Sequence, residues 1–202
     1  MNLSFYTVNS DYCDYLRQFD RCVPYTMQQK STRPFLGVLL EINGHTYYAP
    51  LSSPKPKHQK MKNQLDFIKI NQGYWGAINL NNMIPIAPEL ATKVNPNELT
   101  RSYDNEKYRN LLNNQLSWCN SNKDYIIKKA HNLYTKITTG TANPQLQARC
   151  CNFTLLENKS LEYSQQQTQS LSSAPAAEPI LPNQIPSTGS QGFGGQGFGG
   201  LT

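Results

Sequence analysis

One short segment concentrates side chains that can handle phosphate. The run Ser52-Ser53-Pro54-Lys55-Pro56-Lys57-His58 carries two hydroxyls, and Lys60 and Lys62 follow it. Lysines bring positive charge to a phosphate, and hydroxyls donate hydrogen bonds to its oxygens. The two prolines restrict the backbone and deny it regular hydrogen bonding, which keeps the display stiff. The pattern predicts a phosphate-binding loop, and a solvated surface loop broken by proline is the alternative that it leaves open.

Ser52 and Lys55 also match the Ser-x-x-Lys pattern of acyl-transfer enzymes. That chemistry needs both side chains on one face of a helix. Pro56 follows at once and pushes residue 55 out of the α region. We therefore do not expect a serine hydrolase.

Cationic and aromatic residues precede this segment in the chain. Arg33 stands just before a predicted strand, Lys30 and Tyr25 lie in the polar loop before it, and Tyr12 comes earlier. Aromatic rings interleaved with cations are typical of proteins that hold splayed, single-stranded RNA. Tyr12 also lies on the apolar stripe of a predicted helix, so a place in the core is its alternative.

Metal and cofactor chemistry has little support in the sequence. Only three histidines occur, His45 and His131 do not form a ligand pair, and no acidic cluster or glycine-rich phosphate loop is present. The five cysteines are odd in number and lack a Cys-x-x-Cys pair, which argues against a disulfide scaffold and a thiolate zinc site. We expect no metal, no cofactor and reduced thiols in a cytoplasmic protein.

Charge points to a polyanionic partner. The 202 residues carry a formal net charge of +6, and all 19 Lys and Arg lie before residue 164. A basic globular part suits nucleic acid, although a merely soluble basic protein is equally compatible. No apolar run approaches the ~20 residues that span a bilayer, and no motif of a DNA-recognition helix occurs. We expect neither a membrane nor DNA as partner.

The first half of the chain must position these residues with short strands. Strands are predicted at 3–8, 35–42 and 45–50, and an Asn43-Gly44 hairpin turn joins the last two. A helix that Asn9 or Ser10 can cap and that Pro24 ends is predicted after the first strand. Further strands are predicted near 66–70, 75–80 and 83–86. Such a meander predicts a curved antiparallel sheet or a partly closed small barrel.

The second half of the chain is predicted to be helical. Apolar residues recur at helical spacing over 108–119 and 126–137, and a last packed segment is predicted at 150–163. The fold class is therefore α+β, with helices packed on the sheet. From Ser164 onward Gln, Ser, Pro, Ala and Gly dominate, so we predict one domain at 1–163 and a disordered tail at 164–202.

An ordered set of motifs resembles a known family, the ToxN/AbiQ/CptN toxins of type III toxin–antitoxin systems. The resemblance covers roughly residues 3–160. The motifs are Phe5-Tyr6-Thr7-Val8 with Tyr12, Arg33-Pro-Phe-Leu-Gly37, Tyr48-Ala-Pro-Leu-Ser-Ser-Pro-Lys55, Gly76-Ala-Ile-Asn79, Asn82-Met-Ile-Pro85 and Cys151-Asn-Phe-Thr-Leu-Leu-Glu157.

The resemblance implies a metal-independent, sequence-selective endoribonuclease whose core resembles the small barrel of Kid/MazF-type toxins. It implies a structured repeat RNA as antitoxin, which the toxin cuts from a precursor and which then blocks it in a closed ring of alternating protein and RNA. Cellular or phage RNA is the implied substrate, and abortive phage infection the implied role. A non-catalytic RNA-binding regulator on the same scaffold is the alternative.

The resemblance also implies roles for individual residues. The key serine of the family aligns with Ser53, its neighbouring hydroxyl with Ser52 and its loop lysine with Lys55, while Arg33 and Tyr12 align with its basic and tyrosine positions. In the implied reaction the substrate 2′-OH attacks phosphorus and leaves a 2′,3′-cyclic phosphate and a 5′-OH. The expected RNA-binding residues are Lys57, His58, Lys60, Lys62, Tyr25 and Lys30, with His58 and Tyr12 as candidates for proton transfer.

Overall fold

An antiparallel sheet forms the centre of the molecule. The structure, a computed structural model, describes residues 2–25, 34–98 and 103–172. Seven strands make up the sheet in the order β4-β5-β3-β2-β1-β7, with β6 paired to β3. They are β1 (Ser4–Val8), β2 (Phe35–Ile42), β3 (His45–Ser52), β4 (Phe67–Lys69), β5 (Ala77–Asn79), β6 (Ile84–Pro85) and β7 (Ala91–Val94).

The β2–β3 hairpin is the longest pairing in the sheet and follows from local sequence. Asn43 and Gly44 both have positive φ, 53° and 75°, the conformation of a tight turn whose twist matches the flanking strands. Ile42 pairs with His45 directly across this turn. On its other side β3 pairs first with β6, at Tyr47 and Tyr48, and then with β5, at Leu51 and Ser52. The predicted hairpin is thus confirmed.

The sheet is open among the described strands. β4 and β7 are its two edges, and no pairing joins them. The antiparallel α+β class is confirmed, whereas the closure that a barrel needs is not found. β7 was not expected from the sequence, because Ala91–Val94 is short and only half apolar. It pairs with β1 along the register from Phe5–Val94 to Val8–Ala91.

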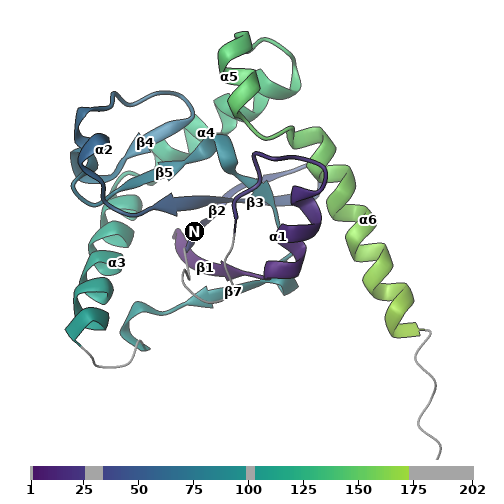
Figure 1. Cartoon of the computed structure of the whole chain (residues 1–202), viewed down its shortest axis with the longest axis horizontal. Helices are drawn as coiled ribbons and strands as arrows, with labels where there is room; N and C mark the ends of the chain where they lie inside the picture. The colour runs from purple at the N-terminus through teal and green to yellow at the C-terminus, as the bar shows by residue number, and fades with distance from the viewer. Residues whose placement is uncertain (1, 26–33, 99–102, 173–202) are drawn as a thin grey trace, which may run out of the picture.

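Helices of very different length surround the sheet. Figure 1 shows α3 and α6 on opposite sides of it, and α4 and α6 pack against β2 and β6 respectively. The described α-helices are α1 (Ser10–Arg17), α2 (Pro56–Lys60), α3 (Tyr103–Ser121), α4 (Lys123–Thr138), α5 (Pro144–Arg149) and α6 (Phe153–Ser172), joined by 3₁₀ turns η1 (Ile70–Gly73), η2 (Leu80–Asn82), η3 (Pro88–Leu90) and η4 (Pro96–Glu98).

The start of α1 agrees with the sequence and its end does not. The Asn9 side chain accepts a hydrogen bond from the Tyr12 backbone N–H at 2.9 Å, which caps the helix. The helix ends at Arg17 rather than at Pro24. Residues beyond it turn back toward the sheet, where Val23 is buried in the core.

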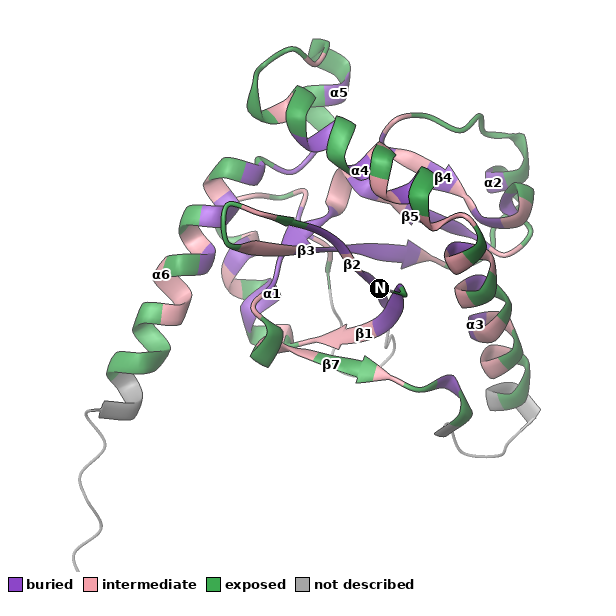
Figure 2. Cartoon of the chain, turned by 180° about the vertical axis from the view of Figure 1, so that it is seen from behind, coloured by how far each residue is buried: buried purple, intermediate pink, exposed green. Residues whose placement is uncertain are grey.

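The last helix extends past the predicted domain boundary. α6 continues to Ser172, so the prediction of disorder from 164 is wrong for 164–172 (Figure 2). Phe153 and Leu156 are fully buried and fix the start of the helix, after which each added residue needs only modest propensity. Gln is a good helix former, and the Ser164 and Thr168 hydroxyls donate to carbonyls one turn back. Residues 173–202 lie outside the described residues.

A buried hydrogen-bond network ties α6 to the sheet. The Glu157 carboxylate accepts hydrogen bonds from the Tyr47 hydroxyl at 2.9 Å and the Tyr134 hydroxyl at 2.8 Å. Burial, and then the bond to Glu157, raises the pKa of Tyr134 to about 12, so this hydroxyl stays a donor. The three residues come from β3, α4 and α6, and so join all three elements.

We expect Tyr47→Phe to lower the free energy of unfolding by about 2 kcal/mol, since a buried carboxylate loses a donor. In a Glu157→Met background the same change should cost much less, because the acceptor is gone as well. Urea denaturation of the two single variants and the double variant measures this coupling. Equal costs in both backgrounds would show that the bond contributes nothing.

Candidate functional site

The two serines of the predicted phosphate-binding segment lie where β3 ends. Ser52 pairs with Ala77 of β5 and is half-buried, whereas Ser53 and Lys55 are exposed. The Asn79 amide donates to the Ser52 Oγ at 2.7 Å. The Ser52 hydroxyl oxygen therefore accepts one hydrogen bond, and its own proton is available for an acceptor. The chain at the end of β3 thus carries two hydroxyls and one ammonium group within four residues.

The chain after Lys55 folds into a short helix, not the irregular loop that the prolines indicated. Lys55 is extended, with φ −143° and ψ 143°, and Pro56 occupies the first turn of α2. Proline suits that position because its missing N–H would have no partner there. Since the helix begins only after Lys55, Ser52 and Lys55 do not share a helical face. This geometry removes the basis for the acyl-transfer alternative.

His58 anchors α2 to the body of the protein. Its side chain is buried, and its ring stands edge-on to Phe67 with centroids 5.7 Å apart. Burial, and then the positive charges of Lys57 and Lys55, lower the pKa of His58. The prediction that His58 contacts RNA or transfers a proton is therefore corrected: α2 turns this side chain inward, where its ring packs against Phe67.

The lysines of the segment face solvent. Lys57 and Lys60 are exposed on α2, three positions apart and so on one face, and Lys62 is exposed just beyond it. Together with Lys55 they form what we call the basic segment, residues 55–62. Its charge can attract phosphates over a broad area without reading bases.

Tyr12 lies in the core and not at the surface. Its side chain is fully buried, its hydroxyl donates to the Pro85 carbonyl at 2.6 Å, and its ring packs edge-on against Tyr163. Burial raises the pKa of this hydroxyl well above its usual value. The proton-transfer role expected of Tyr12 is thus corrected, because the helix stripe on which it lies faces inward. Arg33 and Lys30 lie outside the described residues.

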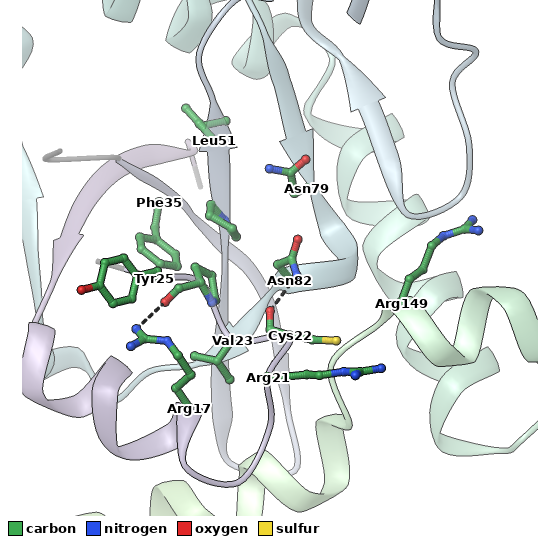
Figure 3. A pocket seen from close by; sticks show the side chains of 12 residues that line it. Arg17, Arg21, Cys22, Val23, Tyr25, Phe35, Leu51, Asn79, Asn82 and Arg149 are labelled. Atoms are coloured by element: carbon green, nitrogen blue, oxygen red, sulfur yellow. Dashed lines mark hydrogen bonds between the residues drawn. The ribbon is translucent and has the colours of Figure 1, made fainter. Parts of the chain in front are cut away.

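A pocket of about 540 Å³ opens near the end of β3, with Leu51 in its lining (Figure 3). Leu51 and Asn79 line it, and Asn79 also holds Ser52, so the pocket and the serine site share a wall. Three arginines contribute to the lining, and no acidic side chain does among the described residues. They are Arg17, Arg21 and Arg149.

Sequence reasoning missed most of this lining. Tyr25 was expected near RNA and does line the pocket, 60% exposed. The three arginines, Asn79 and Asn82 were not singled out as binding residues. They lie on α1, the segment after it, β5, η2 and α5, so no local spacing connects them. Only the fold brings them together.

Two of the arginines are fixed by acids. The Arg17 Nη1 donates to Asp14 at 2.7 Å, and the Arg149 Nε donates to Asp66 at 2.6 Å. Asp66 is buried, and its bond to Arg149 raises the pKa of that guanidinium. Arg21 is exposed and makes no hydrogen bond or ion pair with another described residue. Among the three arginines of the pocket, Arg21 is thus the one most available to an incoming anion.

The described parts of the chain offer neither a metal centre nor a membrane-spanning helix. There, no three His, Cys, Asp or Glu side chains gather as metal ligands do, and no helix is long and apolar enough to cross a bilayer. All five cysteines are free thiols, with Cys22 half-buried at the pocket and the others buried.

The open antiparallel sheet carries hydroxyls and lysines at one strand end, with an arginine-lined pocket next to it, and this arrangement suits a phosphate-bearing ligand. The family of the chain is specific. Residues 4–160 match the family model described as toxin ToxN of type III toxin–antitoxin systems, and the chain belongs to that family.

Relatives agree with this assignment. The chain is 31% identical over 168 residues to endoribonuclease ToxN of Bacillus thuringiensis subsp. kurstaki, covering 81% of this chain and 86% of the relative. It is 33% identical over 172 residues to endoribonuclease ToxN of Pectobacterium atrosepticum, covering 81% and 95%. The predicted family resemblance is confirmed.

Solved structures of related proteins share this fold. One, from work on selective toxin inhibition by a non-coding RNA pseudoknot in type III systems, matches with a TM-score of 0.70 at 30% identity, covering 81% of this chain and 99% of that one. The lactococcal anti-phage endoribonuclease AbiQ matches with a TM-score of 0.69 at 25% identity, covering 82% and 99%.

Proposed function

We propose that this protein is the toxin of a type III toxin–antitoxin system and cleaves RNA sequence-selectively without a metal ion. The match to endoribonucleases over most of the chain carries the proposal. The exposed Ser53 and Lys55 beside a half-buried Ser52 support it, because they offer donors and a cation at a rigid strand end.

The proposed reaction uses the substrate's own 2′-OH as nucleophile. This oxygen attacks the adjacent phosphorus, the bond to the 5′ oxygen breaks, and the products carry a 2′,3′-cyclic phosphate and a 5′-OH. The 2′-OH loses its proton, and the leaving 5′ oxygen gains one. The protein has to hold the groups in line and stabilise a phosphorane that carries extra negative charge.

Each residue at the strand end has a place in this scheme. Lys55, with Arg33 as the second expected cation, neutralises the phosphorane. Ser53 donates a hydrogen bond to a non-bridging oxygen, and Ser52 supports it from a position that Asn79 fixes. Because Tyr12 and His58 are buried, electrostatic stabilisation carries most of the catalysis in this proposal, and the proton carrier is left unassigned.

Incubation of the purified protein with RNA in EDTA tests the proposal. Cleavage should persist, and mapping should find cyclic phosphate at one new end and hydroxyl at the other. A non-catalytic RNA-binding regulator would bind the same RNA and leave it intact. Loss of cleavage in EDTA that added magnesium restores would overturn the metal-independent mechanism.

A repeat RNA is the proposed antitoxin. The toxin would cut the repeats from a longer precursor and then be blocked by them in a closed ring of alternating protein and RNA. Work on related structures describes a non-coding RNA pseudoknot that inhibits a toxin and a processed non-coding RNA that regulates an antiviral system, which supports this partner. Cellular or phage RNA is the proposed target.

The basic segment should bind RNA by charge. We expect a Lys57, Lys60 and Lys62 triple alanine variant to bind single-stranded RNA more weakly whatever its sequence. The salt slope of binding should fall by about 0.7 for each phosphate that the variant no longer neutralises. Fluorescence anisotropy over a range of salt concentrations measures it. A triple alanine variant of Lys93, Lys128 and Lys136, exposed on β7 and α4, has the same net charge; an equal weakening in both would leave the basic segment without a special role.

A further inference from the structure

The pocket beside the serines is well suited to one nucleotide. We propose that it binds a single unpaired nucleotide of the RNA, next to the scissile phosphate, and so contributes to the choice of cleavage site. This inference rests on the proposed function. Its volume of about 540 Å³ lies within the ~300–1,000 Å³ of pockets that hold small ligands.

Tyr25 offers a platform for the base. The Arg17 guanidinium lies 4.5 Å from the Tyr25 ring centroid and donates to the Pro24 carbonyl at 3.0 Å, while Asp14 holds it from α1. This clamp fixes one face of the ring. The ring is nonetheless 60% exposed, and a base stacked on a fixed aromatic ring gains affinity without sequence restriction.

Apolar and amide groups complete the place for a base. Leu51, Val23 and Phe35 are buried apolar residues in the lining. Asn82 uses one amide N–H on the Cys22 carbonyl at 2.6 Å, and Asn79 uses one on Ser52. Each amide keeps its carbonyl oxygen and a second N–H, the pair of groups that reads a base edge.

The position of the pocket sets which nucleotide it receives. Asn79 lines the pocket and bonds the Ser52 Oγ, so a nucleotide seated there lies next to the phosphate that the serines address. Arg21, exposed and without an acid partner among the described residues, can bind the phosphate on its far side. Figure 3 shows Arg21 and Arg149 on the side of the pocket opposite to Arg17 and Tyr25.

A double-mutant cycle between protein and RNA tests the proposal. The probe is a single-stranded RNA that spans the mapped cut, with 2′-deoxyribose at the scissile nucleotide so that binding is measured without cleavage. Abasic sites are placed one at a time on either side of the cut. If no cut is found, the same scan is made along a single-stranded RNA of mixed sequence that the protein binds.

We expect one abasic position to weaken binding to the wild-type protein about 5- to 150-fold, the range of a base–aromatic stack. The same abasic site should weaken binding to Tyr25→Ala by less than about twofold, because the platform is already gone. Tyr125→Ala is the matched control, since this exposed tyrosine on α4 also has a cation, Lys129, 5.1 Å from its ring. It should respond as wild type does.

Arg21→Gln provides the second arm of the test. It should reduce binding of every probe severalfold and lower the salt slope, whereas Lys93→Gln, on edge strand β7, should not. Coupling at one position without any cleavage would uphold the pocket and overturn the proposed nuclease. Cleavage in EDTA with no coupled position would uphold the nuclease and overturn the pocket, and absence of RNA binding would overturn both.

Discussion

Ser53→Ala should reduce the rate of RNA cleavage by at least about 100-fold, the usual effect when one hydrogen-bond donor to a developing oxyanion is removed. Ser53 is exposed at the end of β3, where its hydroxyl can meet a phosphate bound beside Lys55. Alanine removes that donor and leaves the charge of the site unchanged. Single-turnover cleavage of the mapped RNA, with enzyme in excess, measures the chemical step.

Two variants make the result specific. Ser117→Ala removes an exposed serine hydroxyl from α3, away from β3, and should cleave at the wild-type rate. Ser53→Thr keeps a hydroxyl and should recover part of the rate. The free energy of unfolding and the affinity for RNA should change little in Ser53→Ala, because exposed substitutions seldom destabilise. A Ser53→Ala protein that cleaves normally would remove Ser53 from the mechanism.

Local signals in the sequence predicted the part of the site that is built locally. The Asn43-Gly44 turn and the apolar run before it define β2 and β3, and their register places Ser52 and Ser53 at a strand end. Such signals depend on a few adjacent residues, so they are legible without the fold. The same holds for the Asn9 cap of α1.

The residue type and its sequence neighbours did not determine whether His58 and Tyr12 are buried. His58 sits among exposed lysines in the sequence, yet α2 places it three residues after Lys55 on the inner side of a helical turn, against Phe67. Tyr12 was predicted either to contact RNA or to lie in the core, and its hydrogen bond to the Pro85 carbonyl places it in the core. A polar ring suits either place, and only its neighbours across the fold distinguish them.

The pocket depends on contacts between distant segments. Arg149 reaches it because Asp66, 83 residues earlier, holds the guanidinium. Asn82 supports the segment after α1 through the Cys22 carbonyl, 60 residues earlier. Neither pair has a spacing that a helix or strand would impose. The serine segment is therefore built by local sequence and was predicted. The pocket is built by tertiary contacts and was not predicted.

The end of β3 is in close backbone contact with a glycine. Gly76, between η1 and β5, lies directly against the Ser52 carbonyl, so a Cβ there would overlap that oxygen. Its φ of +99° also belongs to the region that side chains rarely adopt. The neighbouring Gly73 approaches the His58 backbone in the same way. The contact between Gly76 and the Ser52 carbonyl thus contributes both to the stability of the fold and to the position of the serines.

Gly76→Ala should lower the free energy of unfolding by at least about 3 kcal/mol, because strained backbone and overlap in a packed core add together. Gly140→Ala is the matched control: its φ is +70°, but beyond its own residue and its chain neighbours no heavy atom lies within 4 Å of the added Cβ. It should cost only about 1 kcal/mol, the conformational part alone. Urea denaturation of both variants separates overlap from strain.

Cleavage by the folded fraction of Gly76→Ala should fall as well, since we expect the overlap to be relieved by movement of the Ser52 carbonyl and with it the end of β3. Gly140→Ala should cleave at the wild-type rate once corrected for the folded fraction. Gly76→Ala protein that is as stable and as active as Gly140→Ala would mean that η1 yields in place of β3. The serines would then be held by the β2–β3 hairpin and the Asn79 amide, without the support of the glycine contact.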